Sequence, residues 1–141
     1  MTPEAARHGR WFGWALAGAA IAALGVRVAY VLVDRRDIVL AGDSYFYHSA
    51  ANLLADGKGF ISPFFLPAHR QAAEHPPLYT MFLAVASVAG LRSVLAHMVW
   101  SCLLGTGTVA LVGIVGRRVA GDRAGVIAAF LAALYPNIWA P

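Results

Sequence analysis

The chain has 141 residues, of which 60% are hydrophobic and 13% are charged, and its mean hydropathy is +0.64. Soluble domains carry about 25% charged residues, so this composition indicates a membrane protein. The formal net charge of +4 comes from basic residues scattered between apolar runs, and the absence of a basic stripe or arm argues against nucleic acid as a partner. The single cysteine, Cys102, excludes an intramolecular disulfide.

Three apolar runs are candidate transmembrane helices. Residues 11–33 contain one charge, Arg27, and at about 1.5 Å per residue they exceed a hydrocarbon core of about 30 Å. A cleaved signal peptide is the alternative, but its apolar region is typically about 7 to 15 residues long. Residues 94–116 and 124–141 carry no formal charge. The fold class predicted is an all-α integral membrane protein with about three transmembrane helices, and close helix packing is expected at Gly105, Gly107, Gly113 and Gly116.

A shorter apolar segment, 78–91, decides the topology. As a helix it would reach only about 21 Å, which is short for a span and typical of an interfacial or re-entrant piece. If it does not cross, residues 1–10 and 117–123 share one side, with net charge +3 from five basic and two acidic residues: Arg7, Arg10, Arg117, Arg118, Arg123, Glu4 and Asp122. The positive-inside rule places that side in the cytoplasm of a plasma-membrane protein. Segment 34–93 then forms a long extracytoplasmic loop. A crossing segment would leave Arg92 alone to mark the cytoplasmic side.

Two helices are expected within the 34–93 loop, beside the membrane. The first begins near Asp43, has apolar residues at helical spacing, and stops at Gly57. We expect its apolar stripe to face lipid or the other helices, and Asp43 to act as its N-cap. The second helix begins at Pro77, where the missing N–H costs little.

The candidate chemistry of this loop lies in acidic and basic side chains at the membrane surface. A carboxylate at Asp43 suits proton abstraction from a hydroxyl or coordination of a divalent cation. Pro76 and Pro77 hold the preceding residues extended, which positions His75 for a phosphate and Glu74 as the candidate metal ligand. A divalent metal is the one cofactor that the sequence leaves open. The remaining loop histidines, His48 and His69, match no zinc spacing and are interpreted as solvated.

Aromatic and in-span residues complete the candidate set. Tyr47 and Tyr79 are typical interfacial aromatics, with a sugar site as the alternative. Arg27 is close enough to the end of its span to snorkel to the outer interface or to pair with a loop carboxylate, and a role beside a lipid phosphate is the functional alternative. His97 is interpreted as an interface residue near the start of the second span.

The order of these features resembles the N-terminal part of the GT-C membrane glycosyltransferases. The segments that carry the resemblance run from Gly42 to Phe60, GDSYFYHSAANLLADGKGF, and from Glu74 to Tyr79, EHPPLY. The closest branch is the glycosyltransferase family 39 group, which includes protein O-mannosyltransferases and RgtA/B/C/D-like proteins. The resemblance implies two juxtamembrane helices in the first extracytoplasmic loop. It also implies a sugar donor on a polyprenyl phosphate and an acceptor hydroxyl outside the membrane.

Carried over by position, the resemblance makes Asp43 the candidate catalytic base. It places Glu74 and His75 at the acidic and basic residues before the family's proline, with His75 on the donor phosphate, and Tyr47 at a recurring aromatic position. Ser44 replaces a second acidic residue that family members often have, which weakens a metal role for this motif. The resemblance covers residues 10–141, the opening of a family member, so membrane lipid and the remaining transmembrane helices of a longer transferase are expected partners.

Two other classes of function remain as alternatives. A non-catalytic small membrane protein, either a truncated remnant or an assembly partner, would retain the loop fold without activity. A transporter or channel fragment is disfavoured because Arg27 is the only charge inside a predicted span and no pair of broken helices is visible.

Overall fold

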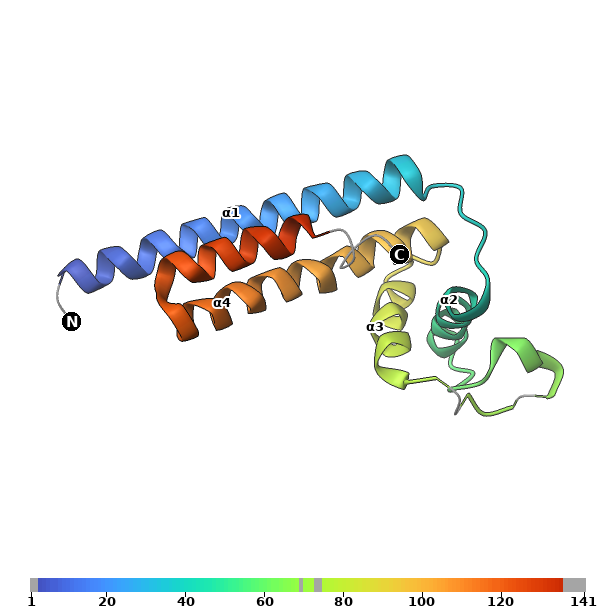
Figure 1. The fold of residues 1–141 in the computed structure, drawn as a ribbon. Helices are drawn as coiled ribbons and strands as arrows, with labels where there is room; N and C mark the ends of the chain where they lie inside the picture. The colour runs from blue at the N-terminus through green and yellow to red at the C-terminus, as the bar shows by residue number, and fades with distance from the viewer. Residues whose placement is uncertain (1–2, 69, 73–74, 136–141) are drawn as a thin grey trace. The chain divides into compact units, whose positions relative to one another are not determined.

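The computed structural model describes residues 3–68, 70–72 and 75–135, and these are built from helices. The helices are α1 (Pro3–Asp34), α2 (Gly42–Ala55), the 3₁₀ helix η1 (Pro63–Ala68), α3 (Pro77–Val88) and α4 (Val94–Leu134) (Figure 1). The all-α prediction is therefore confirmed. The chain divides into two compact units, one formed by Met1–Tyr30 with Cys102–Pro141 and the other, the loop unit, by Val31–Ser101.

Two helices are long and apolar enough to span a membrane. They are the part of α1 from Arg10 to Asp34, with 25 residues and a mean hydropathy of 2.0, and α4, with 41 residues and a mean hydropathy of 1.9. The backbone of α4 is not helical at Ala120 and Gly121, where Gly121 has a φ of 86° that glycine adopts without steric cost. This break lies inside the connection predicted at 117–123. Beside it, Arg117 Nε bonds Asp122 Oδ1 at 2.6 Å.

Small side chains bring the helices of the first unit together. Its buried core combines Ala19 and Ala23 of α1 with Val109 of α4 and, beyond the break, with Ala129 and Ala133. The last part of α4 thus folds back along the first part, as Figure 1 shows for the orange and red segments. Small residues allow such close approach of helix backbones.

The predicted glycine contacts are confirmed at three of four positions. Cβ atoms built on Gly113 and Gly116 would meet residues of the returning segment, and one on Gly105 would lie 2.6 Å from Arg27 Nε. A Cβ on Gly107 would have nothing within 4 Å, so that prediction is wrong. Gly107 faces away from the helix contact that the other three glycines make.

Substitution of Gly125 by alanine is expected to destabilise the first unit by about 1–3 kcal/mol, the typical cost of overpacking. A Cβ at Gly125 would lie 2.6 Å from the Gly113 carbonyl oxygen and 2.8 Å from the Arg117 nitrogen, both of them backbone atoms that cannot rotate away. The measurement is thermal unfolding in detergent micelles. Gly107→Ala is the matched control, and equal melting temperatures for the two variants would contradict this packing.

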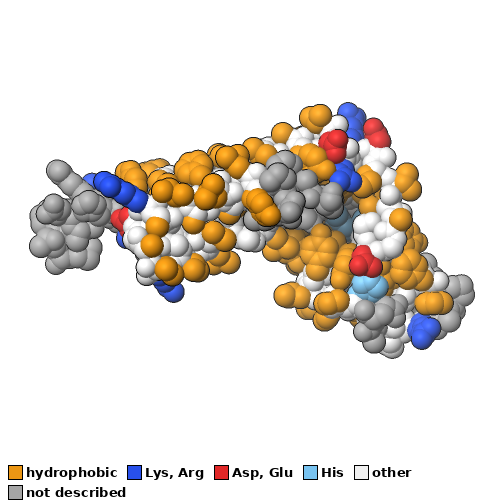
Figure 2. All heavy atoms as spheres, in the orientation of Figure 1, with side chains coloured by type: hydrophobic (Ala, Val, Ile, Leu, Met, Phe, Trp, Pro, Cys, Tyr) orange, Lys and Arg blue, Asp and Glu red, His pale blue; other side chains and the backbone are white. Residues whose placement is uncertain are grey.

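The outer surface of the first unit is apolar. Large hydrophobic side chains are exposed on both of its helices, among them Trp14, Ile21, Leu111, Ile127 and Leu131. Figure 2 shows hydrophobic side chains over much of the visible face of these helices. Helices that are hydrophobic around their whole circumference are typical of a large protein's core or of a membrane span. This surface agrees with the length and hydropathy of the two helices.

Helix α2 has the predicted extent, but its N-terminus differs from the prediction. The N-cap is Ala41, whose backbone N–H donates to Ser44 Oγ at 3.2 Å while the Ser44 hydroxyl donates to the Ala41 carbonyl at 2.7 Å. Asp43 therefore is not the N-cap, because the helix begins one residue before it, and its carboxylate belongs to the first turn. The helix ends at Ala55, before Gly57 with a φ of 74°.

The buried residues of α2 pack against other parts of the loop unit. Phe46 and Ala50 pack on Ala72 in the segment before α3, while Ala51 packs on Leu83 of α3. Of the two expectations for the apolar stripe of α2, contact with other parts of the chain is confirmed. Helix α3 begins with Pro77 at its first position, as predicted, and lies beside α2 (Figure 1).

Candidate functional site

The structure brings together two of the residues singled out from the sequence, Asp43 and His75. Asp43 lies in the first turn of α2, and His75 lies two residues before α3. His75 Nε2 is 3.1 Å from Asp43 Oδ1. The Asp43 side chain is 82% exposed and that of His75 is 18% exposed, so the carboxylate is open to a ligand while the imidazole supports it from the protein side.

Two aromatic side chains, Phe46 and Tyr47, hold the imidazole of His75 in place. The ring stacks on Phe46 with centroids 3.8 Å apart and 17° between planes, and Tyr47 meets it edge-on at 5.4 Å. Phe46 is fully buried, so this surface cannot shift without disturbing the core of the loop unit. His75 is thereby held in one orientation toward Asp43.

The two candidate tyrosines, Tyr47 and Tyr79, pack against each other beside His75. Tyr47 packs edge-on against Tyr79 at 5.0 Å, and the Tyr79 hydroxyl is 2.8 Å from Ser101 Oγ. Both tyrosines are half-buried. Their observed contacts support His75 and the start of α4, and a sugar-binding role for them stays a prediction.

The contact between His75 and Asp43 orients the carboxylate. In the tautomer that carries its hydrogen on Nε2, His75 donates to Asp43. The Nδ1 atom of His75 is buried and has no hydrogen-bond partner among the described residues. A second proton there would make the ring an imidazolium beside the carboxylate. The pair can therefore accept a proton at Asp43 or place positive charge near an anion.

Arg27 is not where the sequence placed it. Its side chain is 3% exposed, and its Nη1 donates to the Ala23 carbonyl at 3.1 Å. Because that carbonyl lies four residues toward the N-terminus of α1, the guanidinium points away from the Val33 end. The prediction of snorkelling to the outer interface is therefore wrong. Nε and Nη2 are buried without a partner among the described residues, against the space left by Gly105.

Replacement of Arg27 by methionine is expected to stabilise the first unit by about 1–4 kcal/mol, because apolar residues often replace buried charges with a gain in stability. The test is thermal unfolding of the detergent-solubilised chain. Arg118→Met, at an exposed position of α4, serves as the control for loss of one positive charge. A fall in stability for Arg27→Met would show that the guanidinium has a stabilising partner.

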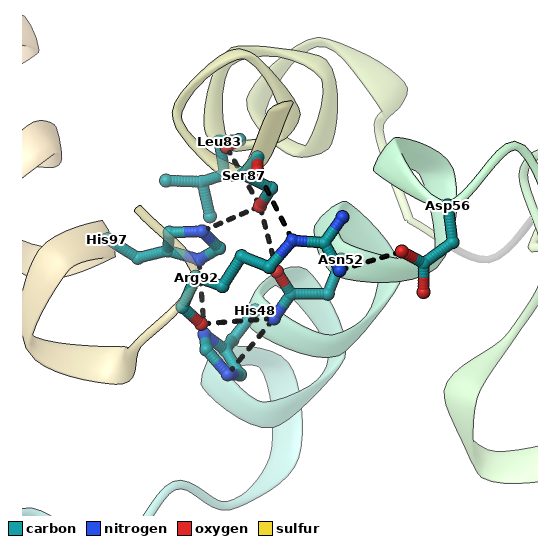
Figure 3. A network of polar contacts seen from close by, with 7 residues as sticks. All are labelled: His48, Asn52, Asp56, Leu83, Ser87, Arg92 and His97. Carbon is teal, nitrogen blue, oxygen red and sulfur yellow. Dashed lines mark hydrogen bonds and ion pairs between the residues drawn. The ribbon is translucent and has the colours of Figure 1, made fainter. Parts of the chain in front are cut away.

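A second polar cluster lies between α2, α3 and the start of α4, and sequence reasoning missed it. It joins His48, Asn52, Ser87 and His97, with Arg92 and Asp56 at its edge (Figure 3). His48 is half-buried and hydrogen-bonded, so its interpretation as a solvated histidine is wrong. His97 is 3% exposed, and its position at the membrane interface stays a prediction. The four-residue spacing of His48 and Asn52, which puts both on one helix face, was the available signal.

Two candidate residues fall outside the described part of the chain. Glu74, the predicted metal ligand, and His69 are not described. Within residues 3–68, 70–72 and 75–135, no group of three or more His, Cys, Asp or Glu side chains is arranged to hold a metal ion. The metal assignment of Glu74 thus stays a prediction from the sequence.

The chain matches no protein-family model, no curated protein and no solved structure. The family resemblance of the 42–60 and 74–79 segments accordingly stays a prediction. Function has to be inferred from the chemistry of the residues that the fold brings together.

Proposed function

We propose that this chain is the N-terminal segment of a membrane glycosyltransferase that transfers a sugar from a polyprenyl-phosphate donor to an acceptor hydroxyl at the extracytoplasmic membrane face. The observation that carries the proposal is the contact between an exposed carboxylate and a partly buried imidazole: Asp43 Oδ1 lies 3.1 Å from His75 Nε2. Both residues lie in segments whose order resembles that transferase family. Their meeting supplies the proton acceptor that such a reaction requires.

The proposed membrane arrangement has three spans. These are α1 and the two parts of α4 on either side of the break at Ala120 and Gly121. Residues 1–10 and 117–123 then lie in the cytoplasm and 34–93 outside, in the plasma membrane. The apolar exterior of the first unit supports this arrangement. The excess of basic residues in 1–10 and 117–123 also supports this arrangement.

In the proposed reaction, Asp43 accepts the proton of the acceptor hydroxyl as its oxygen attacks the anomeric carbon of the sugar. The bond from that carbon to the phosphate oxygen breaks, and the electron pair leaves with the polyprenyl phosphate. His75, when protonated, places positive charge near the departing phosphate. The chemistry therefore depends on alignment and charge placement more than on a strong acid.

Capture of a photoreactive polyprenyl-phosphate sugar in membranes containing the chain tests the donor assignment. We expect crosslinking that natural donor competes away, that His75→Ala weakens, and that Asp37→Asn, at an exposed carboxylate of the same unit, leaves unchanged. Absence of competable crosslinking would overturn the donor assignment. Equal capture of the donor by His75→Ala and the wild-type chain would contradict the assignment of His75 to the donor phosphate.

A further inference from the structure

Four side chains form a closed ring of hydrogen bonds in the loop unit, on the buried side of α2. His48 Nδ1 lies 3.1 Å from His97 Nδ1, and His97 Nε2 lies 2.9 Å from Ser87 Oγ. Ser87 Oγ donates to Asn52 Oδ1 at 2.9 Å, and Asn52 Nδ2 is 3.4 Å from His48 Nε2. Figure 3 shows the four residues converging from α2, α3 and α4.

The chemistry of these groups fixes where each proton lies. The Ser87 hydroxyl has one hydrogen, and its shorter bond is to Asn52 Oδ1 at 2.9 Å, with the Leu83 carbonyl at 3.4 Å as the other acceptor. Its oxygen therefore accepts from His97 Nε2–H. His97 Nδ1 is then bare and accepts from His48 Nδ1–H. His48 Nε2 is bare in turn and accepts from the Asn52 amide. Every donor points the same way around the ring, and both imidazoles are neutral.

We propose that this ring is a pH-sensitive clamp, which holds α2 against α3 and the start of α4 only while His48 and His97 are both neutral. A proton added to His97 Nδ1 would face the Nδ1–H of His48 at 3.1 Å, with two hydrogens between two nitrogens. A proton added to His48 Nε2 would face the Asn52 amide donor. Either event breaks a bond of the ring and leaves buried donors facing each other. The inference does not depend on the proposed transferase activity.

Among the described residues, the charged side chains at the edge of the ring are Arg92 and Asp56. Arg92 precedes α4, donates from Nε to the Ser87 carbonyl at 3.3 Å, and accepts from Asn52 Nδ2 through its own carbonyl. Its Nη1 pairs with Asp56, the C-cap of α2, at 2.7 Å, so the two charges offset each other. Helix α3 contributes Ser87 and contains no Asp, Glu, Lys, Arg or His. The facing ionisable group on α4 is His97 itself.

Burial supports the direction of the pH response. It lowers the pKa of His48 from its usual value near 6.5. The unfolded chain therefore binds more protons than the folded chain as the pH falls below about 6.5, and acid weakens the loop unit. Above that pH the contribution of His48 to stability is fully present and constant.

Amide hydrogen exchange of the detergent-solubilised chain tests the clamp. Between about pH 7.5 and pH 5, the protection factors of α2 and α3 are expected to fall, by up to about tenfold per ring histidine for each pH unit below about 6.5. The helix amides of residues 105–119 serve as the internal control. Protection of α2 and α3 that is independent of pH would overturn the proposal.

Variants assign the response to the ring rather than to other titrating groups. Asn52→Asp places a carboxylate beside His48 Nε2, where it accepts the added proton's hydrogen bond, and is expected to reduce the loss of protection in acid. His75→Ala removes a histidine outside the ring and should leave the response in place, and a response that disappears with His75 would refute the clamp. Ser87→Ala removes the hydroxyl that joins His97 to Asn52 and is expected to lower the protection of α2 and α3 at neutral pH. Thr108→Ala, which removes a hydroxyl that bonds the Leu104 carbonyl of its own helix, is the matched control.

Nitrogen NMR provides a readout that does not depend on unfolding. At neutral pH we expect His48 to carry its proton on Nδ1 and His97 on Nε2, with a scalar coupling between the two Nδ1 atoms across the hydrogen bond. The opposite tautomers would contradict the ring. So would a missing coupling in a sample whose hydrogen-exchange protection shows that the chain is folded.

Discussion

The substitution Asp43→Asn is expected to lower the rate of sugar transfer by about 10²–10⁴-fold, the usual contribution of a positioned general base. The amide has the size of the carboxylate, and its oxygen still accepts from His75 Nε2, so the local geometry is retained. What it loses is the ability to take a proton from the acceptor hydroxyl. The measurement is transfer of labelled sugar from polyprenyl-phosphate donors in membranes containing the chain together with the remaining helices of the proposed transferase.

Matched controls separate loss of the base from loss of charge or fold. Asp37→Asn removes an exposed carboxylate elsewhere in the loop unit and should transfer sugar at the wild-type rate. Asp43→Asn should still crosslink the photoreactive donor, because the donor phosphate is assigned to His75. Normal turnover by Asp43→Asn would remove the base assignment.

Truncation of Phe46 to alanine is expected to destabilise the loop unit by about 3–5 kcal/mol, as for other fully buried aromatic residues. Phe46 is 0% exposed, packs with Ala50 and Ala72, and carries the imidazole of His75 on its ring face. Its loss opens a cavity and frees His75. The measurement is unfolding of the chain in detergent, followed by donor capture at a temperature where the variant is folded.

Phe65→Ala is the control for loss of an aromatic side chain. Phe65 is 45% exposed, and the Arg70 guanidinium lies 5.1 Å from its ring centroid. Exposed contacts of this kind are worth about 0.5–1 kcal/mol. Equal destabilisation by the two substitutions would contradict the assignment of Phe46 to the core beneath His75.

Local rules predicted the two α-helices of the loop, whereas the 3₁₀ helix η1 was not predicted. Gly57, with its positive φ, follows the end of α2, and Pro77 occupies the first position of α3, because both residues act through their own backbone geometry. The break in α4 at Gly121 falls within the connection at 117–123, which the charged residues between two apolar runs predicted. Such signals need only a few neighbouring residues.

Long-range packing explains what the sequence did not reveal. His48 and His97 are separated by 49 positions, so no local pattern indicates that their Nδ1 atoms meet. Arg27 turned inward because Gly105 leaves space for its guanidinium, which depends on how α1 and α4 pack. The capping prediction for Asp43 missed by two positions, since Ser44 supplies the bonds to Ala41.

The candidate site lies between these two cases. Asp43 and His75 were each predicted from residue type and local context, one at a helix start and the other beside two prolines. Their contact across 32 positions follows from the packing of the segment before α3 on Phe46, which supplies the ring under His75. Residue chemistry thus predicted the members of the pair, and tertiary structure determined their distance.

The rate of sugar transfer per captured donor, compared between the wild-type chain and Asp43→Asn in the same membranes, tests the central claim most directly. Normalisation to captured donor separates the chemical step from binding and from the amount of folded chain. The proposed role of Asp43 predicts equal capture and a transfer rate at least about 100-fold lower in the variant. Equal rates per captured donor would contradict it.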